Sequence, residues 1–140
     1  MARAAELRED FELLGHWGQY MCVLVAGFLE NSIQELYGDR VKRTASSDVQ
    51  SFVVRSLDRI QNPNAQRFHE VAGAFNTQWG ADLDLYLDQD AGRRRNALNS
   101  IMSNRHLIAH GGNSAISVGR VREYLDASLE VLDFIEEQCA

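Results

Sequence analysis

The sequence has few of the features that mark several common protein classes. It has one proline, two cysteines and a formal net charge of -6 in 140 residues. Cys22 and Cys139 show no motif spacing, which favours a reduced, cytoplasmic protein over a disulfide-bonded one. The acidic balance excludes a generally basic surface, so any nucleic acid must bind local basic islands such as residues 40–43 and 93–95. Solvated helix ends are the simpler account of each island.

Long hydrophobic runs are also absent. The densest run, YMCVLVAGFL at residues 20–29, has about half the length that a membrane span needs, so we expect a buried helix there and no membrane contact. The N-terminal residues mix acids with apolar side chains, which is not the pattern of a targeting segment. With 45% hydrophobic and 24% charged residues, the composition is that of an ordinary globular chain, and the length fits one domain over residues 1–140.

Apolar residues repeat with helical periodicity along nearly the whole chain. No alternating strand pattern, internal repeat or low-complexity linker is present, which predicts an all-α bundle of five to seven helices. The expected stripes begin with Leu7, Phe11 and Leu14, followed by Val25, Phe28, Leu29, Ile33 and Leu36. Gly15 and Gly18 are expected to kink or break the helix between these stripes.

Several helix boundaries can be predicted from local signals. Ser47 with Gln50 resembles a capping box that opens a helix with Val49 and Phe52 on its apolar side. Asn62-Pro63 ends that helix, and Pro63 suits the first turn of the next. Gly92 separates a short helix from the following segment, and the last helix is expected to begin near Ser117.

The segment SNRHLIAHGG, residues 103–112, places a cation on an apolar stripe. Leu98, Ile101, Met102, Ile108 and Ala109 share one helical face, and Arg105 falls in its middle. A guanidinium there is costly to desolvate unless an anion meets it. One account is an internal pair with Glu30. The other is that the stripe faces a second subunit and Arg105 points into a cleft that holds a phosphate.

His110 and Gly111 also allow two interpretations. Gly111 is the residue expected just after a helix, and a histidine in the last turn interacts favourably with the helix dipole, so the pair can be a stop signal alone. Five residues place Arg105 and His110 about 140° apart on an ideal helix, and two copies across a two-fold axis would bring them to one cleft. His106 and His110 share a face, but two ligands do not make a zinc site. No Walker loop, Gly-x-Ser-x-Gly or paired-carboxylate motif is present.

These residues carry a resemblance to a known family. The string RHLIAHG at residues 105–111, near the end of a helix in a small all-α chain, resembles the signature of the HEPN superfamily. Together with VAGFLE at residues 25–30, it is most similar to the RiboL-PSP-type branch. Two positions depart from the family: His106 stands where Asn or another polar residue is frequent, and Gly112 stands where some active members carry tyrosine.

The resemblance implies a homodimer with a shared RNA-cleaving site that uses no metal or cofactor. Arg105 would stabilise charge on the phosphate, and His110 would take or give a proton in attack by the ribose 2′-OH. Asn104 and His106 would orient the phosphate or tune His110, next to Gly111, and Glu30 would pair with Arg105 or bound the cleft. Such enzymes act as toxins or in defence, with a neutralising antitoxin or an associated effector protein as a partner.

Two other interpretations stay open. The chain can be a catalytically silent HEPN module that binds nucleotides or serves dimerisation and protein interaction. It can also be a helical protein in which Arg105 and His110 are only a buried pair and a helix cap.

Overall fold

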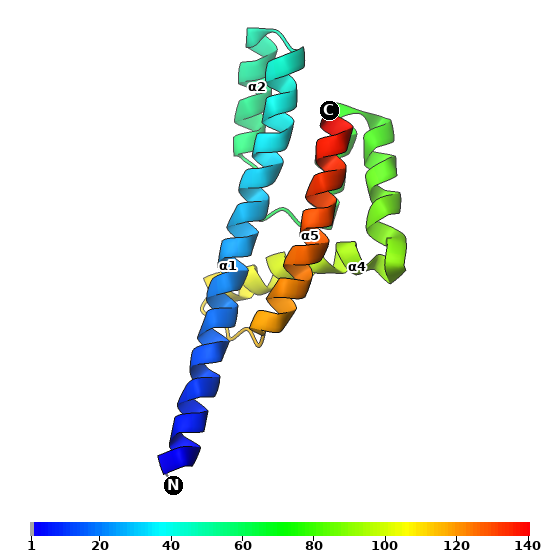
Figure 1. Cartoon of the computed structure of the whole chain (residues 1–140). Coiled ribbons are helices and arrows are strands. Elements are labelled where there is room, and N and C mark those ends of the chain that lie inside the picture. Colours follow the sequence, from blue (N-terminus) through cyan, green and yellow to red (C-terminus); the bar gives the residue numbers. More distant parts are fainter. Residues whose placement is uncertain (1) are drawn as a thin grey trace.

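Residues 2–140 fold into five α-helices joined by short loops. The computed structural model describes residues 2–140, apart from the side chains of Ala2 and Phe11. This range contains no strand, so the all-α prediction is confirmed. The helices are α1 (Ala2–Thr44), α2 (Ser47–Asp58), α3 (Ala65–Phe75), α4 (Thr77–Ala109) and α5 (Val118–Cys139). Figure 1 shows α2 folded back along the C-terminal half of α1 and α5 beside α1. No helix within residues 2–140 is long and apolar enough to cross a membrane.

The first helix runs without a break through both glycines that were expected to interrupt it. Gly18 is instead required by packing, because a Cβ atom there would lie 2.2 Å from the carbonyl oxygen of Ile116. The loop before α5 therefore rests directly on the backbone of α1. The predicted break was wrong because the glycine serves a close approach between distant segments rather than a change of direction.

Only one face of the apolar run at residues 20–29 is buried. Leu29 is fully inaccessible, whereas Tyr20, Leu24 and Phe28 are 57%, 53% and 45% exposed. Leu7 and Leu14 of the first predicted stripe are exposed as well, and the side chain of Phe11 lies outside the described part. The N-terminal end of α1 extends past the other helices (Figure 1). The predicted buried helix is therefore buried on one face and exposed on the other.

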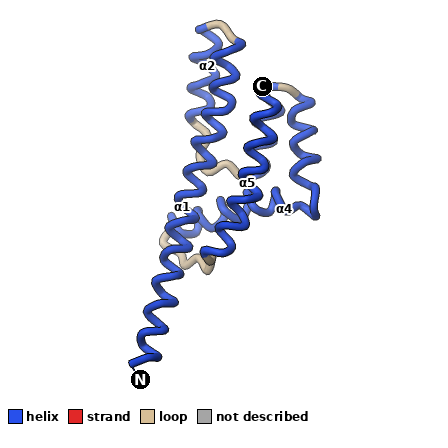
Figure 2. The backbone as a smooth tube through the Cα atoms, viewed as in Figure 1, coloured by secondary structure: helices blue, strands red, loops and turns tan. Residues whose placement is uncertain are grey.

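One hydrophobic core joins the five helices, with Leu57 as the contribution of α2. Its largest fully buried side chains include Tyr37, Phe68, Leu83, Leu98 and Ile135. In the tube view the helices account for nearly all of the chain, with the loops confined to short turns (Figure 2). The core therefore fixes the relative positions of the helices that carry the site.

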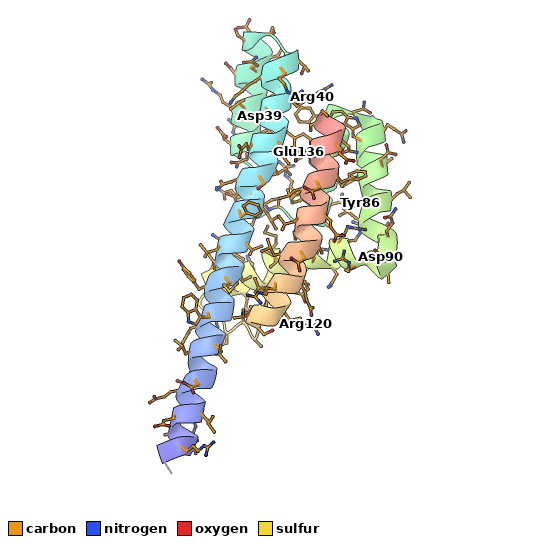
Figure 3. All side chains as sticks on the ribbon, in the orientation of Figure 1. Asp39, Arg40, Tyr86, Asp90, Arg120 and Glu136 are labelled. Carbon is orange, nitrogen blue, oxygen red and sulfur yellow. The ribbon has the colours of Figure 1, made fainter. Side chains whose placement is uncertain are left out.

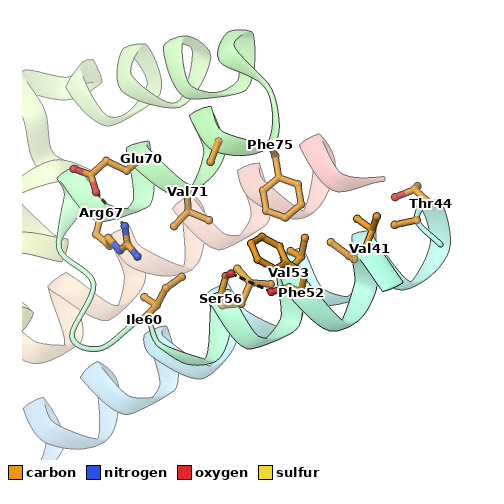
Figure 4. Close-up of a pocket in the computed structure, with 14 residues that line it drawn as sticks. Val41, Thr44, Phe52, Val53, Ser56, Ile60, Arg67, Glu70, Val71 and Phe75 are labelled. Atoms are coloured by element: carbon orange, nitrogen blue, oxygen red, sulfur yellow. Dashed lines mark hydrogen bonds and ion pairs between the residues drawn. The ribbon is translucent and has the colours of Figure 1, made fainter. Parts of the chain in front are cut away.

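The second helix differs from its prediction at its start and on its surface. Ser46 is the N-cap and makes no side-chain capping bond, while Gln50 donates to the carbonyl oxygens of Lys42 and Ala45, so no capping box forms. Val49 and Phe52 are 50% and 74% exposed. They line an apolar groove of about 520 Å³ between α2 and α3, which has an Arg67–Glu70 ion pair at its side (Figure 4).

The next boundaries follow local rules more closely. Asn64 caps α3 by accepting a hydrogen bond from the backbone N–H of Arg67, so Pro63 lies just before the helix rather than in its first turn. Ser117 caps α5, as predicted, by accepting from the N–H of Arg120. The predicted separation at Gly92 is also confirmed, because α4 has non-helical backbone angles from Gln89 to Gly92.

The kink turns the second half of α4 across the bundle behind α1 and α5 (Figure 1). Asp90, Ala91 and Gly92 have φ angles of 54°, 57° and 76°, a left-handed run that only the glycine adopts without strain. The kink thereby carries the end of α4, where the motif lies, to α1.

Candidate functional site

The motif helix ends in a closed C-terminal cap. Gly111, at φ 75°, donates its N–H to the carbonyl of Ile108 at 3.1 Å, and the N–H of Gly112 donates to Leu107 at 2.9 Å. This pair of bonds is a Schellman motif with Gly111 just past the cap His110, so the predicted stop at Gly111 is confirmed. A Cβ at position 112 would lie 2.4 Å from the Leu107 side chain, which excludes a tyrosine there without repacking.

The two histidines of the motif lie against each other at the surface. The ring centroids of His106 and His110 are 4.3 Å apart, with an angle of 64° between the planes, and both residues are exposed. No group of three or more metal-ligating side chains occurs within the described residues. The arrangement places two imidazole rings next to each other in contact with solvent.

Arg105, near the end of α4, is only partly exposed. Burial raises the pKa of the Cys22 thiol to about 11, and the nearby positive charge of Arg105 opposes this shift without cancelling it. Across residues 2–140, Arg105 makes no ion pair and no side-chain hydrogen bond. The Arg105 guanidinium therefore has no anionic partner among the described residues.

The expected pair between Arg105 and Glu30 is not formed. The Glu30 carboxylate instead accepts a hydrogen bond from the backbone N–H of Asn62 at 2.7 Å. Asn62 has a φ of 47° in the loop before α3, a conformation that asparagine tolerates better than most residues. Glu30 thus fixes that loop, and the sequence spacing could not reveal this because 32 residues separate the two partners.

Asn104 has a clear structural partner on each side of its amide. Its nitrogen donates to the carbonyl of Ser100 at 2.8 Å, and its oxygen accepts from the Ser114 hydroxyl at 2.6 Å. Ser114 is buried, and its carbonyl oxygen accepts from the Gln19 amide of α1 at 3.2 Å. These bonds position the loop that follows His110.

The other arginines of α4 are all paired. Arg93 and Arg94 both contact Glu130, and Arg95 donates to Asp88 at 2.8 Å and to Asp84 at 3.1 Å. The basic island expected at residues 93–95 is therefore neutralised within the chain. Figure 3 shows Tyr86 and Asp90 at this kinked part of α4.

Two arginines of the basic island at residues 40–43 also make hydrogen bonds within the chain. Arg40 and Arg43 donate to the carbonyl oxygen of Cys139 at 3.3 Å and 2.6 Å, at the C-terminal end of α5 (Figure 3). Cations at this end of a helix compensate its unsatisfied carbonyl groups. Two of the three cations in this island therefore have a structural role.

One feature beside the motif was missed by the sequence analysis. A polar hollow of about 600 Å³ opens next to His106 and is lined on its other side by the loop before α3 and the start of that helix. Its amide side chains come from two segments about 35 residues apart, so no single stretch of sequence predicts the hollow. The repeated asparagines around Pro63 are the only local signal.

Arg105 and His110 are not brought together within one chain. They lie on one continuous helical segment, where five residues correspond to about 140° of rotation. The described residues therefore present a histidine pair that borders the polar hollow and, apart from it, an arginine without an ion pair.

Comparison with protein families found one match. The family model described as RiboL-PSP-HEPN matches residues 3–140, which is nearly the whole chain. Comparison with curated proteins and with solved structures found no match.

Proposed function

Because the chain belongs to the RiboL-PSP-HEPN family, we propose that it is an endoribonuclease that needs no metal and cuts RNA at an Arg105–His110 site. The observation that carries this proposal is the partly buried Arg105, which has no anionic partner among residues 2–140. A desolvated cation gains most from a charged ligand such as a phosphate. An arginine kept only for stability would more commonly have a carboxylate beside it.

The residue types fit attack by the ribose 2′-OH. His110 would take the proton from the 2′-OH as its oxygen bonds to phosphorus, while the bond from phosphorus to the 5′-oxygen breaks. A second histidine of the assembled site would protonate that leaving oxygen. Arg105 would stabilise the negative charge that builds up on the non-bridging phosphate oxygens. The products are a 2′,3′-cyclic phosphate and a 5′-hydroxyl.

The neighbouring residues would act as positioning groups. Gly111 fixes the helix end at which His110 stands, and the His106 ring packs against the His110 ring. Asn104 would hold the loop that bounds the site through Ser114, and Glu30 would fix the other border through Asn62. No metal is needed, because the nucleophile belongs to the substrate and His110 supplies the proton transfer.

The active form would be a homodimer. Two copies facing each other across a two-fold axis would bring Arg105 of one motif helix and His110 of the other into one cleft, which a single helix cannot do. The exposed apolar side chains of α1 and α5 support such an assembly. They include Trp17, Tyr20, Leu24 and Phe28 of α1 and Leu129 of α5. Patches of this kind are unusual on a monomer.

The proposed biological setting is that of a toxin or defence enzyme in the cytoplasm. Its two cysteines are unpaired, which suits a reducing compartment. A ribonuclease of this kind requires control, so a neutralising antitoxin or an associated effector protein is the proposed partner besides RNA.

Incubation of the purified protein with mixed cellular RNA and tRNA in excess EDTA tests the proposal. We expect cleavage with 2′,3′-cyclic phosphate and 5′-hydroxyl ends, and no cleavage of DNA or of RNA carrying 2′-O-methyl groups. Cleavage that stops in EDTA and returns with magnesium would contradict the mechanism. Nucleotide binding without any cleavage would instead identify a catalytically silent module.

A further inference from the structure

The polar hollow beside His106 has a chemical character of its own. Its lining includes Asn64 and Gln66 from α3 and its cap, and Asn99, Ser103 and His106 from α4. Met102, only 5% exposed, also reaches its wall. Amide and hydroxyl groups around an apolar contact suit a flat, polar and uncharged ring.

The orientation of two of these amides is fixed by the backbone. The Asn64 oxygen accepts from the N–H of Arg67, and the Asn99 oxygen accepts from the N–H of Ala65, both at 3.0 Å. A backbone N–H can only donate, so each amide must direct its oxygen to the backbone. The NH₂ groups are the parts of these two side chains left for a ligand, and they can only donate.

The hollow is poorly suited to a phosphate. Arg95 also lines it, but this guanidinium is already bound to Asp84 and Asp88. Fixed neutral donors without a free arginine or lysine match a base edge better than a phosphate group, which favours charge-assisted contacts. The phosphate-binding cation of the proposed site, Arg105, does not line the hollow.

We propose that this hollow binds the nucleobase next to the cleaved phosphate and selects guanine. Guanine presents two adjacent acceptors, O6 and N7, whereas adenine presents N7 beside an amino donor that would face the fixed NH₂ groups. This inference rests on the proposed function, because His106 both lines the hollow and contacts His110. Glu30 is a positioning residue for the same subsite, since it holds the Asn62 loop.

Cleavage of short RNAs that differ only in one base next to the cut tests this selection. We expect guanosine to exceed adenosine by roughly tenfold to hundredfold in kcat/KM, the usual worth of a two-donor base contact. Inosine, which keeps O6 and N7, should behave as guanosine, and 7-deazaguanosine, which lacks N7, should lose most of the advantage.

The matched variants are Asn64→Asp and Asn99→Asp. Each keeps the oxygen that accepts from the backbone and replaces the NH₂ donor by an acceptor, so each should reduce the guanosine preference to within about threefold. Asn96→Asp is the control, because Asn96 lies on the same helix but lines a different hollow with Arg93 and Tyr124. It adds the same charge and should leave the preference unchanged.

Binding measurements separate this inference from the proposed function. Trinucleotides with 2′-O-methyl groups cannot be cleaved, and calorimetry with guanosine and adenosine versions reports the base preference directly. A guanosine preference that Asn99→Asp removes supports the subsite even if no RNA is cut. Equal affinity for both versions, no binding of either, or equal cleavage in both contexts would overturn it.

Discussion

The two halves of α4 use arginine in opposite ways. Next to the kink, Arg93, Arg94 and Arg95 are each held by carboxylates, and Arg94 also lies 3.9 Å above the ring of Tyr86. At the other end, Arg105 has no partner within residues 2–140, although it too is partly buried. An arginine with its anion supplied by the fold serves the structure, whereas one without an anion is available for a ligand.

The contrast between the two halves of α4 predicts that substitutions at its C-terminal end reduce activity strongly and stability only slightly. His110→Ala should reduce the rate of RNA cleavage roughly a hundredfold to ten-thousandfold, the usual worth of a positioned acid or base. His110 is exposed and terminates the helix, so thermal unfolding should change little. The control is His16→Ala, which removes an exposed histidine of α1.

Arg105→Ala should have a comparable effect on cleavage, because it removes the cation proposed to meet the phosphate. Arg105→Lys retains the charge but not the two-pronged geometry and should recover only part of the rate. Initial rates and melting temperatures of both variants are the required measurements. If Arg105→Ala unfolds the protein while leaving the specific activity of the folded fraction intact, Arg105 belongs with the structural arginines.

The exposed apolar face of α1 is the proposed contact with a second copy of the chain. Leu24→Glu places a charge in the exposed apolar face of α1, so we expect a shift from dimer to monomer and a loss of cleavage of at least about tenfold. Light scattering coupled to size exclusion measures the assembly, and Leu85→Glu is the control, since Leu85 is 70% exposed on α4. A wild-type protein that is only a 15.8 kDa species would contradict the composite site.

The paired half of α4 should respond in the opposite way. The Arg94 side chain is 9% exposed and contacts Glu130 and Tyr86. Arg94→Ala should therefore lower the free energy of unfolding by about 2 kcal/mol, with specific activity unchanged. Arg120→Ala, which breaks an ion pair whose members are both 65% exposed, should cost less than about 0.5 kcal/mol in the same denaturant titration.

The sequence predicted best what depends on a few neighbouring residues. The Ser117 cap, the interruption at Gly92 and the Gly111 stop are all local, and all three are present. The fold class followed from the helical period of apolar residues in the same way. These signals are strong because helix ends are determined by groups within about one turn.

Contacts between distant segments could not be predicted in this way. The sequence around Gly18 suggests a helix breaker, because the close approach of the Ile116 carbonyl cannot be seen in the sequence. The apolar stripes suggest a pair between Glu30 and Arg105, whereas the Glu30 carboxylate accepts from the backbone N–H of Asn62. The period of a helix shows which residues share a face, not whether that face meets the core, solvent or another chain, and Phe52 is an example of an apolar face left open.

The pH dependence of stability also tests the ion pairs next to the kink of α4. Partial burial raises the pKa of Glu130, but the hydrogen bonds and positive charges of Arg93 and Arg94 lower it more, so the net pKa lies below its ordinary value of 4.5. A carboxylate with a lowered pKa stabilises the folded state fully above pH 4.5, and this contribution is lost as the pH falls through the lowered pKa. Because the Glu130 side chain is 40% exposed, solvent screening keeps the contribution below about 1 kcal/mol.

Urea titrations between pH 7 and pH 3 measure this contribution. Glu130→Gln should be less stable than the wild type at pH 7, and the difference should shrink as the pH falls through the lowered pKa of the wild-type carboxylate. Glu123→Gln removes a carboxylate from the exposed pair with Arg120 and controls for the change of charge. A stability difference that is independent of pH would mean that Glu130 acts through packing or hydrogen bonding alone. The arginines next to the kink would then not be held by charge, and the contrast with Arg105 would lose its physical basis.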